Sequence, residues 1–159
     1  MLEKAIEITP ADYQIWFNLG NTYVLLKEQQ KSIHAYTKAL ETAEQELAVN
    51  PGNGVLLQSV AMYHAVLGQK EKALHFLAQV TGPFAAAPET LYTSAVIYQM
   101  VGQPELALNA IHSALLAGFP LNQVEGTAIF AGLRSNKKYL EIIKSHAALA
   151  VHQGQQTVN

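Results

Sequence analysis

The strongest constraint on the fold is a spacing of 34 residues that recurs through the middle of the chain. The segment LGQKEKAL, which ends at Leu74, returns 34 positions later as VGQPELAL. The identical pairs at this offset include five that are small or apolar: Leu57 and Leu91, Ala61 and Ala95, Gly68 and Gly102, Ala73 and Ala107, and Leu74 and Leu108. Because these five pairs are small or apolar, the spacing predicts an array of repeated helical units.

An earlier unit joins the series with a longer spacing. The segment WFNLGNTY, residues 16–23, corresponds to LQSVAMYH, residues 57–64, which lies 41 positions later. The excess of seven residues over 34 is close to two turns of an α-helix, and the apolar helical pattern continues through KALETAEQELAV. Two turns lengthen a helix and leave its buried face nearly unrotated. We therefore expect an extended second helix in this unit.

Each unit is predicted to form two helices. In the first unit, apolar and aromatic residues follow helical spacing between residues 13 and 26, and Asp12 is the expected N-cap. The connection to the second helix is short, which favours an antiparallel pair. Pro51 and the pair Gly82 and Pro83 are expected to end second helices, because proline cannot extend them.

This pattern resembles the tetratricopeptide repeat (TPR), which carries Trp, Leu-Gly and Tyr in its first helix, a small and an aromatic residue in its second, and a closing proline. In the first unit these positions are held by Trp16, Leu19, Gly20, Tyr23, Ser32, Tyr36, Ala39 and Pro51. The later units match at Leu57, Ala61, Gly68, Ala73 and Leu77, and at Leu91, Ala95, Tyr98, Gly102, Ala107, Ile111 and Ala114. His64 stands where tyrosine is usual. The resemblance implies an all-α, right-handed superhelical solenoid of antiparallel helix pairs, with about three repeats and a C-terminal capping pair.

The expected organisation is a single TPR domain over residues 1–159. Its parts are 1–10, the end of a preceding repeat helix; 12–51, a repeat with an extended second helix; 54–83 and 88–118, two further repeats; 121–152, the capping helices; and 153–159, a tail. The stretch FAGLRSNKKY resembles the terminal unit of some bacterial TPR proteins. Within the capping pair we expect these residues to be buried: Phe130, Leu133, Tyr139, Leu140, Ile142, Ile143, Ala147 and Leu149.

Small residues are expected at the points where the two helices of a unit press together. Gly20, Ala61 and Ala95 hold this position in the three units. A larger side chain there would push the backbones apart. Trp16 and Tyr23 are expected to fill the space between their unit and its neighbour.

Composition and motifs argue against most other classes of function. The net charge is −2 and the basic residues are scattered, so no nucleic-acid partner is expected. No apolar run is long enough for a membrane span, so we expect no membrane insertion. The sequence has no cysteine, which fits a reducing compartment, so we expect a cytoplasmic location, with a periplasmic one left open. Catalytic motifs are missing and the six histidines lack metal-ligand spacing, so no enzyme activity, metal or cofactor is expected.

In TPR arrays the first helices line a concave groove that holds peptides or partner helices. The resemblance therefore implies a protein-interaction scaffold, and helical phase gives the groove residues as Phe17, Asn21, Val24, Gln58, Met62, Tyr92, Val96 and Gln99. One kind of TPR groove binds a C-terminal carboxylate through lysines and asparagines. Here Phe17, Glu89 and Thr93 replace its basic residues, so that ligand is not expected.

Two alternatives stay open from the sequence. The chain could be the C-terminal regulatory or interaction region of a larger protein, which could be an enzyme, because it begins inside a repeat. It could also be a homo-oligomerisation module. Low charge and an incomplete N-terminal face would leave apolar surface for a second copy to cover.

Overall fold

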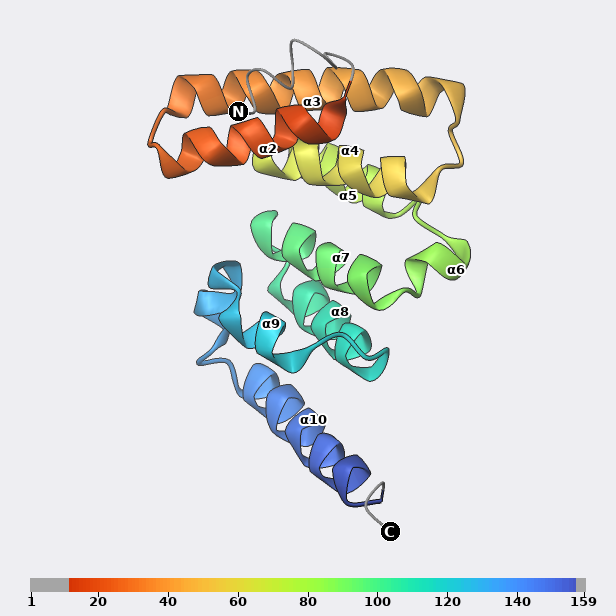
Figure 1. Cartoon of the computed structure of the whole chain (residues 1–159), viewed down its shortest axis with the longest axis vertical. Helices are drawn as coiled ribbons and strands as arrows, with labels where there is room; N and C mark the ends of the chain where they lie inside the picture. The colour runs from red at the N-terminus through yellow and green to blue at the C-terminus, as the bar shows by residue number, and fades with distance from the viewer. Residues whose placement is uncertain (1–11, 157–159) are drawn as a thin grey trace. The chain divides into compact units, whose positions relative to one another are not determined.

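The computed structural model describes residues 12–156, with side chains described as far as residue 148. Within this range all regular structure is helical (Figure 1), which confirms the all-α prediction. The chain divides into two compact units, residues 1–81 and residues 82–159, and each is described by itself. The helix end expected at residues 1–10 lies outside the described residues. No helix in the described part is both long enough and apolar enough to span a bilayer.

The first unit consists of two helical hairpins. Its helices are α2 (Tyr13–Leu25), α3 (Gln29–Val49), α4 (Gly54–Val66) and α5 (Lys70–Leu77). Helix α2 packs on α3, α4 packs on α5, and α3 also packs on α4. As expected, Asp12 caps α2: its Oδ1 accepts hydrogen bonds from the backbone N–H groups of Gln14 and Ile15, at 2.9 and 3.2 Å.

The extension of the first unit's second helix is confirmed. Helix α3 has 21 residues, whereas α5 has 8. Its added turns bury Ala43 and Leu47 in one cluster with Leu56 and Val60 of α4. The added turns of α3 therefore cover α4, the first helix of the next repeat, and do not project into solvent.

Gly20 lies at the closest approach of α2 and α3, as the sequence predicted. A Cβ atom placed on Gly20 would overlap the Cδ1 and Cε1 atoms of the Tyr36 ring. Ala61 and Ala95, at the equivalent positions, are fully buried. A small residue at this position is therefore a condition for the helix pair to close.

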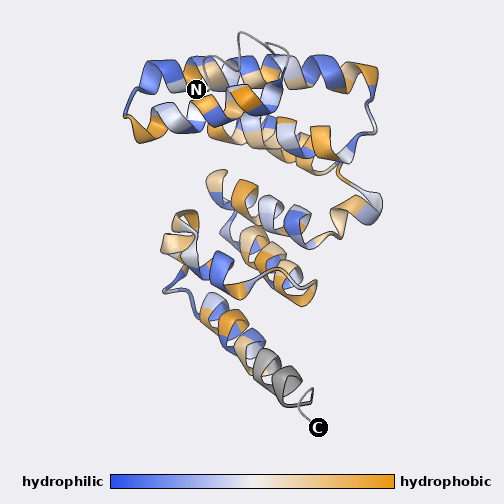
Figure 2. Ribbon diagram, viewed as in Figure 1, coloured by the Kyte–Doolittle hydropathy of each residue, from blue (hydrophilic) through white to orange (hydrophobic). Residues whose placement is uncertain are grey.

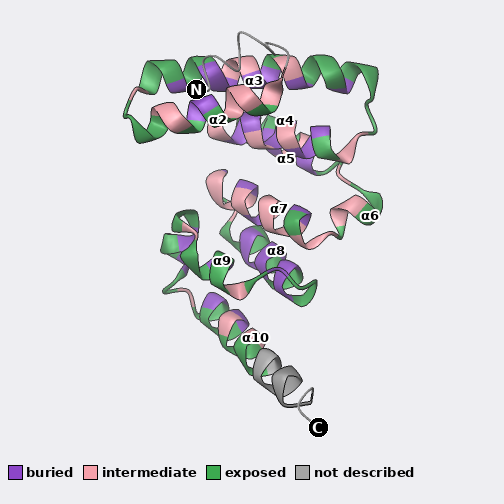
Figure 3. Ribbon diagram, in the orientation of Figure 1, coloured by how far each residue is buried: buried purple, intermediate pink, exposed green. Residues whose placement is uncertain are grey.

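The second unit begins with a short helix and ends with a long one. Its elements are α6 (Gly82–Ala85), α7 (Pro88–Met100), α8 (Pro104–Leu116), α9 (Leu121–Gly126), the 3₁₀-helix η1 (Ala128–Leu133) and α10 (Lys137–Gln156). Helices α7 and α8 form the repeat pair. Apolar residues are frequent on α8 (Figure 2), and Figure 3 shows much of that helix buried. They form one core with Phe130 of η1 and Tyr139 of α10.

Several element boundaries differ from the sequence expectation. Helix α5 ends at Leu77, and the pair Gly82 and Pro83 begins the short helix α6 instead of closing α5. The first capping segment is two helices, because Thr127 takes an extended backbone conformation (φ −76°, ψ 117°) between α9 and η1. Helix α10 continues to Gln156, past residue 152 where we expected the tail.

The burial expected in the capping segment is correct for one face of α10 only. Phe130, Leu133, Tyr139 and Ile142 are buried, and Ile143 is half-buried. The predictions for Leu140 and Ala147 were wrong, since both are exposed. Helix α10 contacts α8 and α9 with the opposite face, so nothing in the described unit covers these two residues. The side chain of Leu149 lies outside the described residues.

Candidate peptide-binding surface

Three of the predicted groove residues share one face of α2. Phe17, Asn21 and Val24 follow the spacing i, i+4, i+7, which aligns side chains along a helix. Asn21 is exposed, Val24 is 53% exposed and Phe17 is half-buried. The face therefore presents one amide between an aromatic and an aliphatic side chain.

The Asn21 side chain is held by the second helix of its own pair. The Tyr36 hydroxyl donates a hydrogen bond of 2.8 Å to Asn21 Oδ1. Burial of Tyr36 raises the pKa of its hydroxyl, so the donor stays protonated at neutral pH. With Oδ1 engaged in this bond, the two N–H groups of the amide are the donors that the exposed Asn21 side chain can offer to a ligand. Sequence reasoning identified Asn21 but not its partner, because the two residues lie on different helices.

Phe17 belongs to an aromatic cluster at the inner side of this face. Its ring centroid lies 5.6 Å from that of Tyr36 and 4.9 Å from that of Tyr63 on α4. Tyr13 also contacts Tyr63, at 6.2 Å. Burial, more than any neighbouring charge, raises the pKa of the Tyr63 hydroxyl. This cluster fixes Phe17 in place and leaves only part of its ring accessible.

The groove residues predicted on α4 lie deeper than those on α2. Gln58 is only 8% exposed. Met62 is half-buried and packs against the same apolar cluster as Phe17. Direct contact with a ligand would therefore fall mainly to α2 in the first unit, and Met62 would support Phe17.

In the second unit the predicted residues Tyr92, Val96 and Gln99 are all half-buried on α7. The Tyr92 ring stacks on Phe119, with centroids 4.1 Å apart, and its hydroxyl lies 2.6 Å from Thr127 Oγ1. Tyr92 thus packs within its own unit. Gln99 Oε1 is buried and makes no hydrogen bond with the described residues.

His64, which replaces the usual tyrosine, is a buried packing residue. Its Nδ1 lies 2.8 Å from Gln69 Oε1 and its Nε2 lies 3.4 Å from Glu44 Oε1. Its ring stacks on Phe76 at 5.3 Å. Glu44 belongs to the added turns of α3, so the longer helix brings a carboxylate near Nε2, although Nε2 makes no hydrogen bond with the described residues. In the described part of the chain, no three His, Asp or Glu side chains gather in a way that could hold a metal ion.

A separate apolar hollow of about 400 Å³ lies between α2 and α3. Its lining residues are Trp16, Leu19, Tyr23, Gln30, Lys31, His34 and Ala35. The Trp16 and His34 rings meet edge to face at 6.3 Å. Trp16 and Tyr23 were the residues expected to fill the space beside this unit, and both line the hollow.

The comparisons with known proteins agree with the repeat pattern. A family model described as tetratricopeptide repeat matches residues 1–34. Among solved structures, a crystal structure of MamA is similar to this chain, with a TM-score of 0.55 and 12% sequence identity, over 97% of this chain and 87% of that one. No curated protein matches the sequence. The repeat spacing, the helix pairs with their small crossing residues and these two matches support a fold of the tetratricopeptide-repeat type.

Proposed function

We propose that the chain is a non-catalytic scaffold that binds a peptide segment of a partner protein. The binding face in the first unit is the side of α2 that carries Phe17, Asn21 and Val24. The observation that carries the proposal is the hydrogen bond between Tyr36 and Asn21, because it holds an exposed amide in one orientation. A preoriented group loses less conformational entropy when a ligand binds, so more of the interaction energy remains for affinity.

The chemistry of this face favours an uncharged, partly apolar peptide. The Asn21 N–H groups would donate to a backbone carbonyl of the peptide, and a neighbouring apolar side chain would pack on Val24 and the open part of Phe17. None of these three residues carries a charge.

Selected peptides test the proposal. Peptides would be selected from a random phage-displayed library on the full chain, and their affinities measured by fluorescence anisotropy. For peptides that bind the α2 face, Val24→Glu should lower the affinity about tenfold or more, because it puts a charge in an apolar contact. Asn21→Ala should weaken them by about two- to tenfold, which corresponds to the loss of one hydrogen bond.

Leu116→Glu is the matched control. It places the same charge at another exposed aliphatic residue, on α8, and should leave these affinities unchanged. Tyr92 is unsuitable as a test position, because its ring packs inside the second unit. If every selected peptide binds Val24→Glu as tightly as the wild type, the α2 face is not the binding surface.

A second candidate function is association between copies of the chain. Leu25, the last residue of α2, and Leu26, the residue after it, are 83% and 60% exposed, which is unusual for adjacent leucines. If this turn is an interface, sedimentation velocity should show a concentration-dependent dimer that Leu25→Glu abolishes. A monomer at all concentrations would rule this function out.

A further inference from the structure

A groove runs along the outer face of α10 in the second unit. It encloses about 610 Å³ and is lined by Arg134, Tyr139, Leu140, Ile143, Lys144 and Ala147, with Glu125 at its edge. This volume falls in the range of small ligand or side-chain pockets. The groove belongs to the capping segment and does not include the α2 face.

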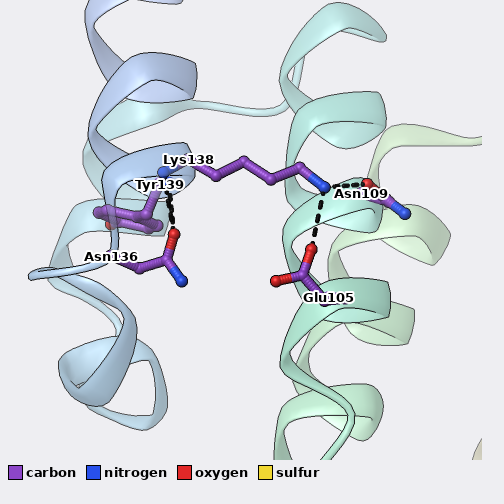
Figure 4. A network of polar contacts seen from close by, with 5 residues as sticks. All are labelled: Glu105, Asn109, Asn136, Lys138 and Tyr139. Carbon is purple, nitrogen blue, oxygen red and sulfur yellow. Dashed lines mark hydrogen bonds and ion pairs between the residues drawn. The ribbon is translucent and has the colours of Figure 1, made fainter.

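The groove has a fixed wall, because α10 is anchored to α8 by polar contacts (Figure 4). Lys138 Nζ donates to Asn109 Oδ1 at 2.9 Å and lies 3.2 Å from Glu105 Oε2. At the start of the helix, Asn136 Oδ1 accepts from the backbone N–H groups of Lys138 and Tyr139, at 2.9 and 3.4 Å. The Lys138 contacts add to the burial of Tyr139 and Ile142, which pack in the core of the unit while Leu140 stays exposed.

The floor of the groove is an aliphatic stripe. Leu140, Ile143 and Ala147 follow the spacing i, i+3, i+7 on one side of α10. Leu140 is 54% exposed, although helix α10 buries Tyr139 and Ile142 on its other side. A stripe of this kind is what a partner segment with large apolar side chains requires.

The rim of the groove is basic. Two basic residues, Arg134 and Lys144, line the groove. Lys137 and Lys138 lie on the same stretch of chain but form ion pairs with Glu141 and Glu105. Arg134 is oriented by hydrogen bonds from its guanidinium to the backbone oxygens of Glu125 and Thr127, at 2.8 and 3.4 Å. Lys144 makes no ion pair or hydrogen bond with the residues that the structure describes. Glu125 is the one acidic residue in the lining.

One hydroxyl in the lining has no acceptor for its proton. The Tyr139 hydroxyl is buried beside the Arg134 guanidinium, which can only donate, and its own O–H group finds no acceptor within the described part of the chain. Burial raises its pKa, so the group remains a neutral donor at physiological pH. A buried hydroxyl without an acceptor is unfavourable, and a ligand oxygen would satisfy it.

We propose that this groove binds an acidic segment of a partner protein that carries large aliphatic side chains. The aliphatic side chains lie on Leu140, Ile143 and Ala147, while carboxylates meet Arg134 and Lys144 at the rim. An oxygen of the segment accepts from the Tyr139 hydroxyl. A second copy of α10 fits less well, because it would bring another set of lysines to a rim that is already basic.

The test uses peptides selected on the full chain from a random phage-displayed library. Those that bind this groove should contain Asp or Glu beside Leu or Ile. Their affinity, measured by fluorescence anisotropy, should fall about tenfold or more in Lys144→Glu and should weaken as salt rises. Tyr139→Phe, which keeps the ring and removes the hydroxyl, should lower it by a few-fold. Lys72→Glu, at an exposed lysine of α5, is the charge control and should have no effect.

Four outcomes would overturn the proposal that the α10 groove binds an acidic segment. One is that no selected peptide is sensitive to Lys144→Glu, and another is that the sensitive peptides are basic or neutral. A third is a dimer in sedimentation velocity that Leu140→Glu abolishes, since a second copy would then occupy the groove. Binding of the chain to anionic vesicles that Leu140→Glu removes would assign the face to a membrane. Peptides that no longer bind Val24→Glu but still bind Lys144→Glu report on the α2 face alone. The proposal for the α10 groove and the proposal for the α2 face can therefore be refuted independently.

Discussion

The helix pair α2–α3 and the helix pair α7–α8 occupy the same place in the repeat but close with different side chains. In the first pair, Gly20 lies against the ring of Tyr36, and there is no room for a Cβ atom. In the second pair, the equivalent residues are Ala95 and Ile111, which are both fully buried in one cluster. The smallest residue, Gly20, is paired with the large Tyr36, and the slightly larger Ala95 is paired with the smaller Ile111. What the repeat conserves internally is the combined volume at the crossing point and not the residue type.

The largest effect on stability is expected at the aliphatic crossing, which is the contact region of α7 and α8 that holds Ala95 and Ile111. Ile111→Ala would leave a cavity in the core of the second unit, because Ile111 is fully buried in a packed cluster that can relax only in part. We expect it to lower the free energy of unfolding by about 2–5 kcal/mol, measured by urea denaturation. Amide exchange should accelerate first in α7 and α8.

Leu116→Ala serves as the control for that measurement, because Leu116 lies on the same helix and is 62% exposed. It should change the stability by less than about 0.5 kcal/mol. Equal effects of the two variants would mean that Ile111 is not the residue that closes this helix pair.

The aromatic crossing, where Gly20 of α2 lies against Tyr36 of α3, should lose stability when the side chain is enlarged and not when it is reduced. Gly20→Leu would insert a side chain where even a Cβ atom overlaps Tyr36, and it should destabilise the chain by about 1–3 kcal/mol. Urea denaturation measures the loss, and faster amide exchange should be confined to α2 and α3. Gly52→Leu is the matched control, because a Cβ atom placed on Gly52 meets no atom within 4 Å.

A double substitution sharpens the comparison. Combining Gly20→Ala with Tyr36→Ile gives the first pair the same two residue types as the second. The double variant should be more stable than the sum of the single effects predicts, by about 0.5–3 kcal/mol, because the two positions share one contact. Strict additivity would show that the volumes at the two positions are not matched.

The smallest effect concerns the polar edge of the aromatic crossing, which the aliphatic pair lacks. Tyr36→Phe keeps the ring and removes the hydrogen bond to Asn21. It should destabilise the chain by about 0.5–1.5 kcal/mol in urea denaturation. By releasing the Asn21 amide it should also weaken peptides that bind the α2 face, and no loss of their affinity would argue against a preoriented Asn21.

Local sequence signals predicted the parts of the fold that depend on neighbouring residues. Asp12 caps α2 because its carboxylate reaches the N–H groups two and three positions later. The two added turns of α3 were visible as an apolar period that continued to Leu47. The small residue at Gly20 was likewise readable from its spacing. Each of these depends on contacts whose geometry the repeat itself fixes.

Other features could not be predicted because they depend on which element covers a face. An apolar stripe on α10 was read as buried, yet the structure buries Tyr139 and exposes Leu140, since α8 and α9 contact one side only. The first member of the capping pair was expected to be one helix, but it breaks at Thr127, whose hydroxyl lies 2.6 Å from that of Tyr92. Periodicity shows that a helix has an apolar face, but it does not show how much of it has a partner.

For the candidate surfaces the same division holds. The sequence by itself determined the repeat, the helix pairs and the phase that places Phe17, Asn21 and Val24 on one face, because helical geometry fixes relations over a few residues. Only the tertiary structure decided that Tyr36 orients Asn21, that Glu44 approaches His64, and that a basic groove borders Leu140. Those relations join side chains from separate helices, and their distances are set by how the helices pack against one another.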